Sequence, residues 1–311
     1  MKSVLSRFKP LIRWVILGAS LFFLTGILKQ NWQSATSFRL DNAGWACLAI
    51  ALGITLSAHI CAGWVWSQTL LRDFQQSVDS GHLMQAYLQT NIAKYLPGNI
   101  WHYYGRINAA TSAGASLEIA TVTVLLEPLL MAAAALLVAL LASQTVVSRY
   151  GTVGLWLQWL SLFGVLLAIH PRVLNPVIAH LSRLKRKTAS SSEDALPVRL
   201  LHYPMLPLLG GLGFVLLRGL GFLITFWAIA PFNVEQIPLL LSGFSVSWLV
   251  GLIVPGAPGG LGVFEATAIA LLGRNFPLGL LLGGVALYRL VSVTSEAMGG
   301  GLAWLDQQIS D

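Results

Sequence analysis

Residues 42–71 read NAGWACLAIALGITLSAHICAGWVWSQTLL, and this stretch contains no Asp, Glu, Lys or Arg. A second stretch, 236–264, is free of the same four residue types. An apolar run longer than about 18 residues is typical of a helix that crosses a lipid bilayer. The two stretches therefore predict an all-α fold, a polytopic helical bundle embedded in a membrane.

The composition of the whole chain agrees with this prediction. Of the 311 residues, 56% are hydrophobic and 10% are charged. Soluble domains contain about 25% charged residues, so a water-soluble fold could not bury this much apolar surface. We therefore expect a single polytopic membrane domain over 1–311.

The formal net charge of +7 does not indicate a nucleic-acid partner, because the basic residues form no basic face interleaved with aromatics. They lie in short segments between apolar runs, at Lys2, Arg7, Lys9, Arg13, Arg172, Arg183, Lys185, Arg186, Lys187 and Arg199. Loops rich in Lys and Arg stay on the cytoplasmic side of a membrane. We therefore place the N-terminus and a basic loop, 171–200, on the cytoplasmic side of the cell (plasma or inner) membrane.

The apolar pattern predicts about seven or eight membrane segments. Spans are expected at 11–28, 43–70, 117–142, 152–170, 205–230, 237–254 and 276–305. We interpret the first as an uncleaved span, because it is longer than a signal-peptide core and has no Ala-x-Ala site. Segment 263–273 is too short to cross about 30 Å as a helix, so it is expected to enter and leave on one side.

The residues that carry covalent or metal chemistry form no recognisable pattern. Cys47 and Cys61 lie fourteen residues apart on one predicted helix, which separates them by about 21 Å and excludes a disulfide between them. No spacing of Cys or His resembles a metal site, and no nucleotide-binding loop is present. We therefore expect no metal, no cofactor and no enzymatic activity.

A Gly-rich break follows one of the apolar runs. Pro255-Gly-Ala-Pro-Gly-Gly-Leu-Gly262 holds four glycines and two prolines in eight residues, so no continuous helix passes through it. Irregular backbone at membrane depth is tolerated where it is buried in protein or lines a wet cavity. The helix that follows would then point its first amides at the cavity, a geometry that suits a phosphate. An ordinary turn at the membrane surface is the alternative interpretation.

A second break lies in Lys94-Tyr-Leu-Pro-Gly-Asn-Ile-Trp-His-Tyr-Tyr-Gly-Arg106, whose aromatic residues suit the headgroup layer. We therefore predict broken or re-entrant helices near Pro97 and near Pro255. The two Pro-Gly pairs are 158 residues apart, about half the chain. This spacing suggests an internal duplication of the kind found in transporters, although chance could also produce it.

Five charged residues lie within or beside the apolar segments: Glu127, Arg218, Glu265, Arg289 and Glu296. Each costs at least about 2.5–3.5 kcal/mol at mid-membrane, so we expect them to face the bundle interior. Arg289 and Glu296 are seven residues apart, an axial separation of about 10.5 Å, so each needs its own partner. Two interpretations remain open, namely ion pairs that only hold the bundle together and groups that bind a substrate.

Three motifs carry a resemblance to a known family. They are Gly114-Ala-Ser116 with Ala120, Val124 and Glu127, then Pro258-Gly-Gly-Leu-Gly-Val-Phe-Glu265-Ala, and Tyr288-Arg289-Leu. Over about 84–301 the chain resembles the transmembrane part of lysylphosphatidylglycerol synthases and their stand-alone flippase-like relatives. The family carries a Gly-Glu pair before an Arg after the first proline. Here 99–105 has no acid, although Arg106 fits.

The resemblance implies movement of a lipid or lipid-linked molecule between leaflets, through a cavity lined by broken helices. The partner would be a membrane lipid with a phosphate headgroup. We expect no aminoacyl transfer, because no synthase domain follows Gly301. The expected headgroup cavity comprises Glu127, Arg218, Gly259, Gly260, Gly262, Glu265 and Arg289, with Lys94, Pro97, Arg106 and Glu296 in secondary positions.

Each group in this cavity is expected to have a role. The glycines would let the headgroup approach backbone amides, and Arg218 and Arg289 would attract its phosphate. Glu127 and Glu265 would balance these arginines or bind a cationic headgroup. Two alternatives remain: a non-transporting scaffold for a membrane lipid-modifying enzyme, and an embedded transferase that would need a base such as His102.

Overall fold

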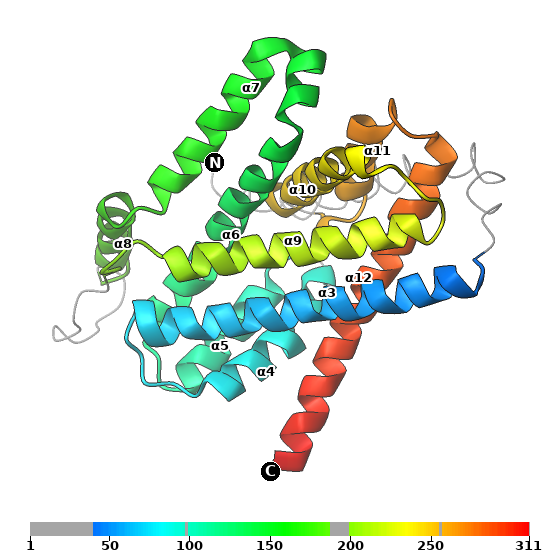
Figure 1. The fold of residues 1–311 in the computed structure, drawn as a ribbon. Coiled ribbons are helices and arrows are strands. Elements are labelled where there is room, and N and C mark those ends of the chain that lie inside the picture. Colours follow the sequence, from blue (N-terminus) through cyan, green and yellow to red (C-terminus); the bar gives the residue numbers. More distant parts are fainter. Residues whose placement is uncertain (1–39, 97–98, 187–198, 255–256, 311) are drawn as a thin grey trace, which may run out of the picture.

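The computed structural model describes residues 40–96, 99–186, 199–254 and 257–310. The predicted span at 11–28 and both prolines of the predicted breaks, Pro97 and Pro255, lie outside these residues. Within the described parts the chain is helical and has no β-strand (Figure 1). The helical fold class predicted from the sequence is therefore confirmed.

The helices follow one another in this order: α3 (Asn42–Gln68), η1 (Thr69–Asp73), α4 (Ser80–Asn91), η2 (Ile92–Tyr95), α5 (Trp101–Ser112), α6 (Leu117–Ala139), η3 (Leu140–Ala142), α7 (Ser143–Ala168), α8 (Pro171–Arg186), α9 (Met205–Trp227), η4 (Val234–Gln236), α10 (Ile237–Ile253), η5 (Pro258–Gly260), α11 (Val263–Leu272) and α12 (Leu278–Ser310). Six helices in the described residues are long and apolar enough to cross a membrane: Asn42–Asp73, Leu117–Ala142, Gly151–Ala168, Met205–Trp227, Val234–Ile253 and Leu278–Ile309. These match six of the predicted spans, and the predicted total of seven or eight is not reached within the described residues.

Helix starts follow from capping residues in the sequence. The side chain of Asp41 accepts a hydrogen bond from the amide of Gly44 at 2.7 Å, so α3 begins there. Ser116 caps α6 in the same way, by accepting from the amide of Ile119 at 3.2 Å. An amide capped in this way has a hydrogen-bond partner other than water, which favours the start of a helix at that position.

The predicted basic loop, 171–200, is helical over its first half, where α8 extends from Pro171 to Arg186. Apolar residues recur there at helical spacing, in the pairs Val173-Leu174 and Val177-Ile178. Leu174 packs against the buried core, and Asn175 exchanges two hydrogen bonds with the backbone of Leu200. Basic residues on the other positions did not prevent the helix, which corrects the expectation of an open loop.

The fold is built from two halves with the same order of elements, 42–142 and 205–310. Each half has a long helix, a broken pair of helices and a second long helix: α3, α4–α5 and α6 in the first, and α9, α10–α11 and α12 in the second. α3 and α9 pack side by side and run in opposite directions (Figure 1). Glycines allow the close approach, because Gly44 lies against Ala228 at one end and Gly210 lies against Val65 at the other.

The packing between the halves is reciprocal. α6 packs on α9 and α10 of the other half, while α12 packs on α3 and α4. Exchanging the two halves therefore maps each of these contacts onto another one. Halves of similar structure and opposite direction are the arrangement of the inverted repeats found in many transporters.

Aromatic side chains fill the core of the second half. The ring of Phe222 in α9 lies 5.2 Å from that of Phe244 in α10 and 5.3 Å from that of Tyr288 in α12. Phe264 of α11 lies 5.9 Å from Phe244 and 6.1 Å from Tyr288. This cluster fixes α11 between its neighbours, so the helix after the Gly-rich break has a defined position.

Candidate functional site

A cavity of about 100 Å³ lies between the two halves, which is room for several water molecules. Helices from both halves line it. Its charged lining consists of four basic side chains and two carboxylates: Lys94, Arg106, Arg218, Arg289, Glu127 and Glu296. Formal charge in the lining is therefore positive.

The two predicted breaks meet beside this cavity. η2 and η5 are in contact, and the ring of Tyr95 occupies the space where a side chain on Gly259 would lie. Gly259 and Gly260 have φ angles of 58° and 72°, which glycine adopts without strain. Pro258 and Gly260 are buried, so this irregular backbone is enclosed by protein. The described part of the Gly-rich break, 257–262, is therefore part of the cavity wall.

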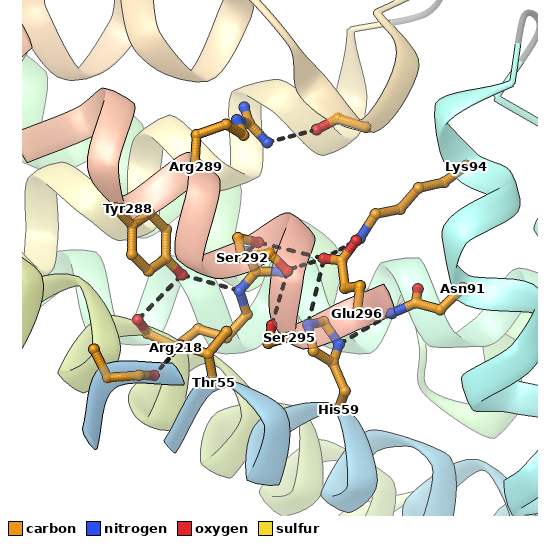
Figure 2. A network of polar contacts seen from close by, with 12 residues as sticks. Thr55, His59, Asn91, Lys94, Arg218, Tyr288, Arg289, Ser292, Ser295 and Glu296 are labelled. Carbon is orange, nitrogen blue, oxygen red and sulfur yellow. Dashed lines mark hydrogen bonds and ion pairs between the residues drawn. The ribbon is translucent and has the colours of Figure 1, made fainter. Parts of the chain in front are cut away.

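Glu296 of α12 is the centre of one polar network (Figure 2). Its side chain is fully buried, and one carboxylate oxygen lies 2.7 Å from Nζ of Lys94. The same oxygen lies 3.3 Å from Nε2 of His59 and 3.6 Å from a guanidinium nitrogen of Arg218. Nδ2 of Asn91 is 3.1 Å from the other ring nitrogen of His59. Groups from three separate helical segments thus converge on one carboxylate, and Asn91 of a fourth segment contacts the histidine among them.

The guanidinium of Arg218 has a partner for each of its nitrogens. Nε donates to the hydroxyl of Tyr288 at 3.1 Å, and a terminal nitrogen donates to Ser292. The remaining nitrogen faces Glu296. A central arginine of α9 is therefore tied to α12 by hydrogen bonds and charge.

Arg289 holds the Gly-rich break. Its Nε donates to Glu265 at 2.7 Å, and its terminal nitrogens donate to the carbonyls of Gly259 and Gly260 at 3.0 and 3.3 Å. The second carboxylate oxygen of Glu265 accepts from the amide of Gly262 at 2.6 Å. A Glu at the third position of a helix commonly reaches back to the cap in this way. The break is thus fixed by one arginine and one carboxylate.

This geometry differs from the expectation that glycine amides face the headgroup. The amide of Gly262 is occupied by Glu265, and it is the carbonyls of Gly259 and Gly260 that face Arg289. Gly259 and Gly260 line the cavity, whereas Gly262 and Glu265 lie behind its lining. Arg289 and Glu296 have separate partners, as their spacing in the sequence predicted.

A matching ion pair lies in the first half. Arg106 of α5 donates to Glu127 of α6 at 2.7 Å, and the hydroxyl of Tyr87 donates to the other oxygen of Glu127 at 2.6 Å. The guanidinium also lies over the ring of Tyr87, 3.6 Å from its centroid. In both halves an ion pair thus connects the helix after the break to the next long helix. The order of the charges is reversed: Arg precedes Glu in the first half and follows it in the second.

Of the charged residues predicted for the cavity, all but Glu265 line it, together with several uncharged residues that were not predicted. His59, Asn91 and His102 all line the cavity and were not named as cavity residues. His59 is a polar residue in the middle of an otherwise apolar stretch, which was an available signal. His102 and Arg106 are four residues apart, the spacing of neighbours on one helix face.

The described residues thus define an all-helical, multi-pass type of membrane protein with buried charges around a cavity between two halves. Comparison of the chain with protein-family models found no match, and comparison with curated proteins found none.

Proposed function

We propose that this protein moves an anionic lipid or lipid-linked molecule between the leaflets of the cell membrane. The observation that carries the proposal is the position of the cavity, at the meeting point of two broken helical pairs from halves of opposite direction. Transporters with inverted repeats place their substrate sites at such broken helices, near the bilayer midplane.

The charge of the cavity supports an anionic headgroup. Four basic side chains and two carboxylates line it, and Glu265 behind the lining neutralises Arg289, so one excess positive charge remains that a phosphate would offset. The resemblance of the sequence motifs to the flippase-like region of lysylphosphatidylglycerol synthases points to the same class of substrate. No covalent chemistry is part of this proposal.

Reconstitution into liposomes tests the proposal. Vesicles containing fluorescently labelled phosphatidic acid or phosphatidylglycerol are treated with an impermeant quencher, and the rate at which inner-leaflet label becomes accessible is measured. Vesicles with the protein should lose inner-leaflet fluorescence faster than empty vesicles. A rate equal to that of empty vesicles with both lipids would contradict the proposal.

Matched variants relate the activity to the cavity. Arg106→Gln removes a cavity guanidinium, and we expect it to lower the rate at least tenfold, because a group in the lining is lost. Arg274→Gln changes an exposed arginine outside the lining and should transport like the wild type. A scaffold function predicts instead that joint substitution of Arg218 and Glu265 leaves the cellular phenotype intact.

A further inference from the structure

Five buried polar atoms in the cavity wall have no hydrogen-bond partner among the residues that the structure describes, and three of them are the hydroxyl of Tyr95, one oxygen of Glu296 and Nε2 of His59, which lies 3.3 Å from the other oxygen of Glu296. The remaining two are nitrogens that make no ion-pair contact of their own. They are Nδ1 of His102 and Nε of Arg106, whose residues are 6% and 2% exposed. A buried polar group without a partner carries a desolvation cost that nothing offsets, so such groups normally face water or a ligand. Both residues line the cavity.

The two atoms are placed to act together. His102 and Arg106 are four residues apart in α5, so their side chains leave the helix as neighbours on one face. The Nε of arginine can only donate, and Nδ1 of a neutral histidine donates in one of its two tautomers. Two neighbouring donors suit one ligand group that carries several acceptor oxygens.

The other two arginines of the lining, unlike Arg106, have a partner for every guanidinium nitrogen. Each nitrogen of Arg218 faces Tyr288, Ser292 or Glu296, and each nitrogen of Arg289 faces Glu265 or a glycine carbonyl. Binding a phosphate at either arginine would mean giving up contacts that already exist. Arg106 can keep its bond to Glu127 and still offer Nε.

We infer that the phosphoryl group of the transported lipid binds on α5, between Nδ1–H of His102 and Nε–H of Arg106, and not at Arg218 and Arg289. This inference rests on the proposed function and names the subsite within the same cavity. The charge of Arg106 is shared with Glu127, whose two oxygens already accept from Arg106 and Tyr87. The remaining basic side chains of the lining supply the attraction for the anion.

Binding to the purified full-length protein in detergent tests the inference. The probe is dihexanoyl phosphatidic acid, followed by intrinsic tryptophan fluorescence, with inorganic phosphate and dihexanoylglycerol as separate arms. Wild-type protein should bind phosphatidic acid and not dihexanoylglycerol. Binding of inorganic phosphate without phosphatidic acid would overturn the assignment to a lipid headgroup.

Variants at the two positions separate hydrogen bonding from charge. Arg106→Lys keeps a cation beside Glu127 but has no Nε–H, and His102→Leu has no donor. Loss of a hydrogen bond to a charged group weakens binding by about tenfold or more, so we expect that loss in each variant. His102→Asn carries an amide nitrogen close to the position of Nδ1 and should bind like the wild type.

His82→Asn and Arg274→Lys are the controls, because both residues are exposed and lie outside the cavity lining. Size-exclusion profiles and thermal unfolding confirm that each variant is folded. Wild-type affinity in folded Arg106→Lys and His102→Leu would overturn the inference, and so would equal losses in His102→Asn and His102→Leu. In either case transport in liposomes would still support the proposed function, so the two failures are distinguishable.

Discussion

At the scale of single residues, the contact between Gly259 and Tyr95 shows how closely the two breaks are fitted. The ring occupies the volume of the absent side chain, and the φ angle of Gly259 is 58°. Both facts make glycine the residue that this position accepts. The contact joins the two halves at the cavity wall.

Gly259→Ala should therefore lower the free energy of unfolding by at least about 1–2 kcal/mol from the backbone conformation alone, and further through the clash with Tyr95. Thermal unfolding in detergent measures the effect. Gly213→Ala is the control, because nothing lies within 4 Å of a β-carbon built on this helical glycine. Similar unfolding temperatures for the two variants would show that the contact does not matter.

The partners of the buried charges could not be predicted from the sequence. Arg218, Arg289 and Glu296 were identified as buried charges because the bilayer penalises them wherever they lie in an apolar span. The partners could not be assigned, since Lys94 and Glu296 meet across 202 residues of chain. That the amide of Gly262 is bonded to Glu265 also depends on local geometry that composition does not reveal.

At the scale of elements, α11 depends on one ion pair for its start. Glu265 caps the helix and binds Arg289, which in turn binds two carbonyls of η5. The Gly-rich break and the long helix α12 are therefore connected by side-chain contacts as well as by the polypeptide backbone. These contacts hold the described part of the irregular segment against α12.

Arg289→Gln should destabilise the protein by about 3–5 kcal/mol, because it leaves Glu265 buried without its cation. The double variant Glu265→Gln with Arg289→Gln removes both charges and should recover part of this loss. A double-mutant cycle of thermal unfolding gives the coupling. Purely additive losses would show that the two side chains are not coupled.

Helix positions were predictable because the apolar runs have clear limits. The span predicted at 117–142 coincides with the helical segment Leu117–Ala142, which begins after the capping Ser116. The helix α8 was not predicted, because its basic residues indicate a loop, although its apolar residues are spaced for one helix face.

At the scale of the whole molecule, two halves of opposite direction enclose one cavity. The spacing of the two Pro-Gly pairs suggests this duplication. The charged residues of the two ion pairs do not reveal it in the sequence. Arg precedes Glu in one half and Glu precedes Arg in the other, so no common charge motif is visible. The relation becomes apparent from the helix packing.

The orientation proposed from the basic residues makes a prediction for the intact membrane. A cysteine at Arg172, on the exposed surface of α8, should react with an impermeant reagent from the cytoplasmic side. A cysteine at Val234, which is 77% exposed and follows α9, should react from the opposite side. Cys47 and Cys61 are first replaced by serine. Labelling of both positions from one side would contradict the predicted crossing of α9.

The fit of Tyr95 against Gly259 also constrains how these two positions evolve. A residue with a side chain at position 259 fits this packing only where position 95 carries a side chain smaller than tyrosine, and it also bears the strain of the left-handed backbone, which asparagine and aspartate tolerate best. The two positions are 164 residues apart, so ordinary neighbour effects do not connect them. We expect positions 95 and 259 to covary among homologous chains, and an alignment of homologous sequences would test this.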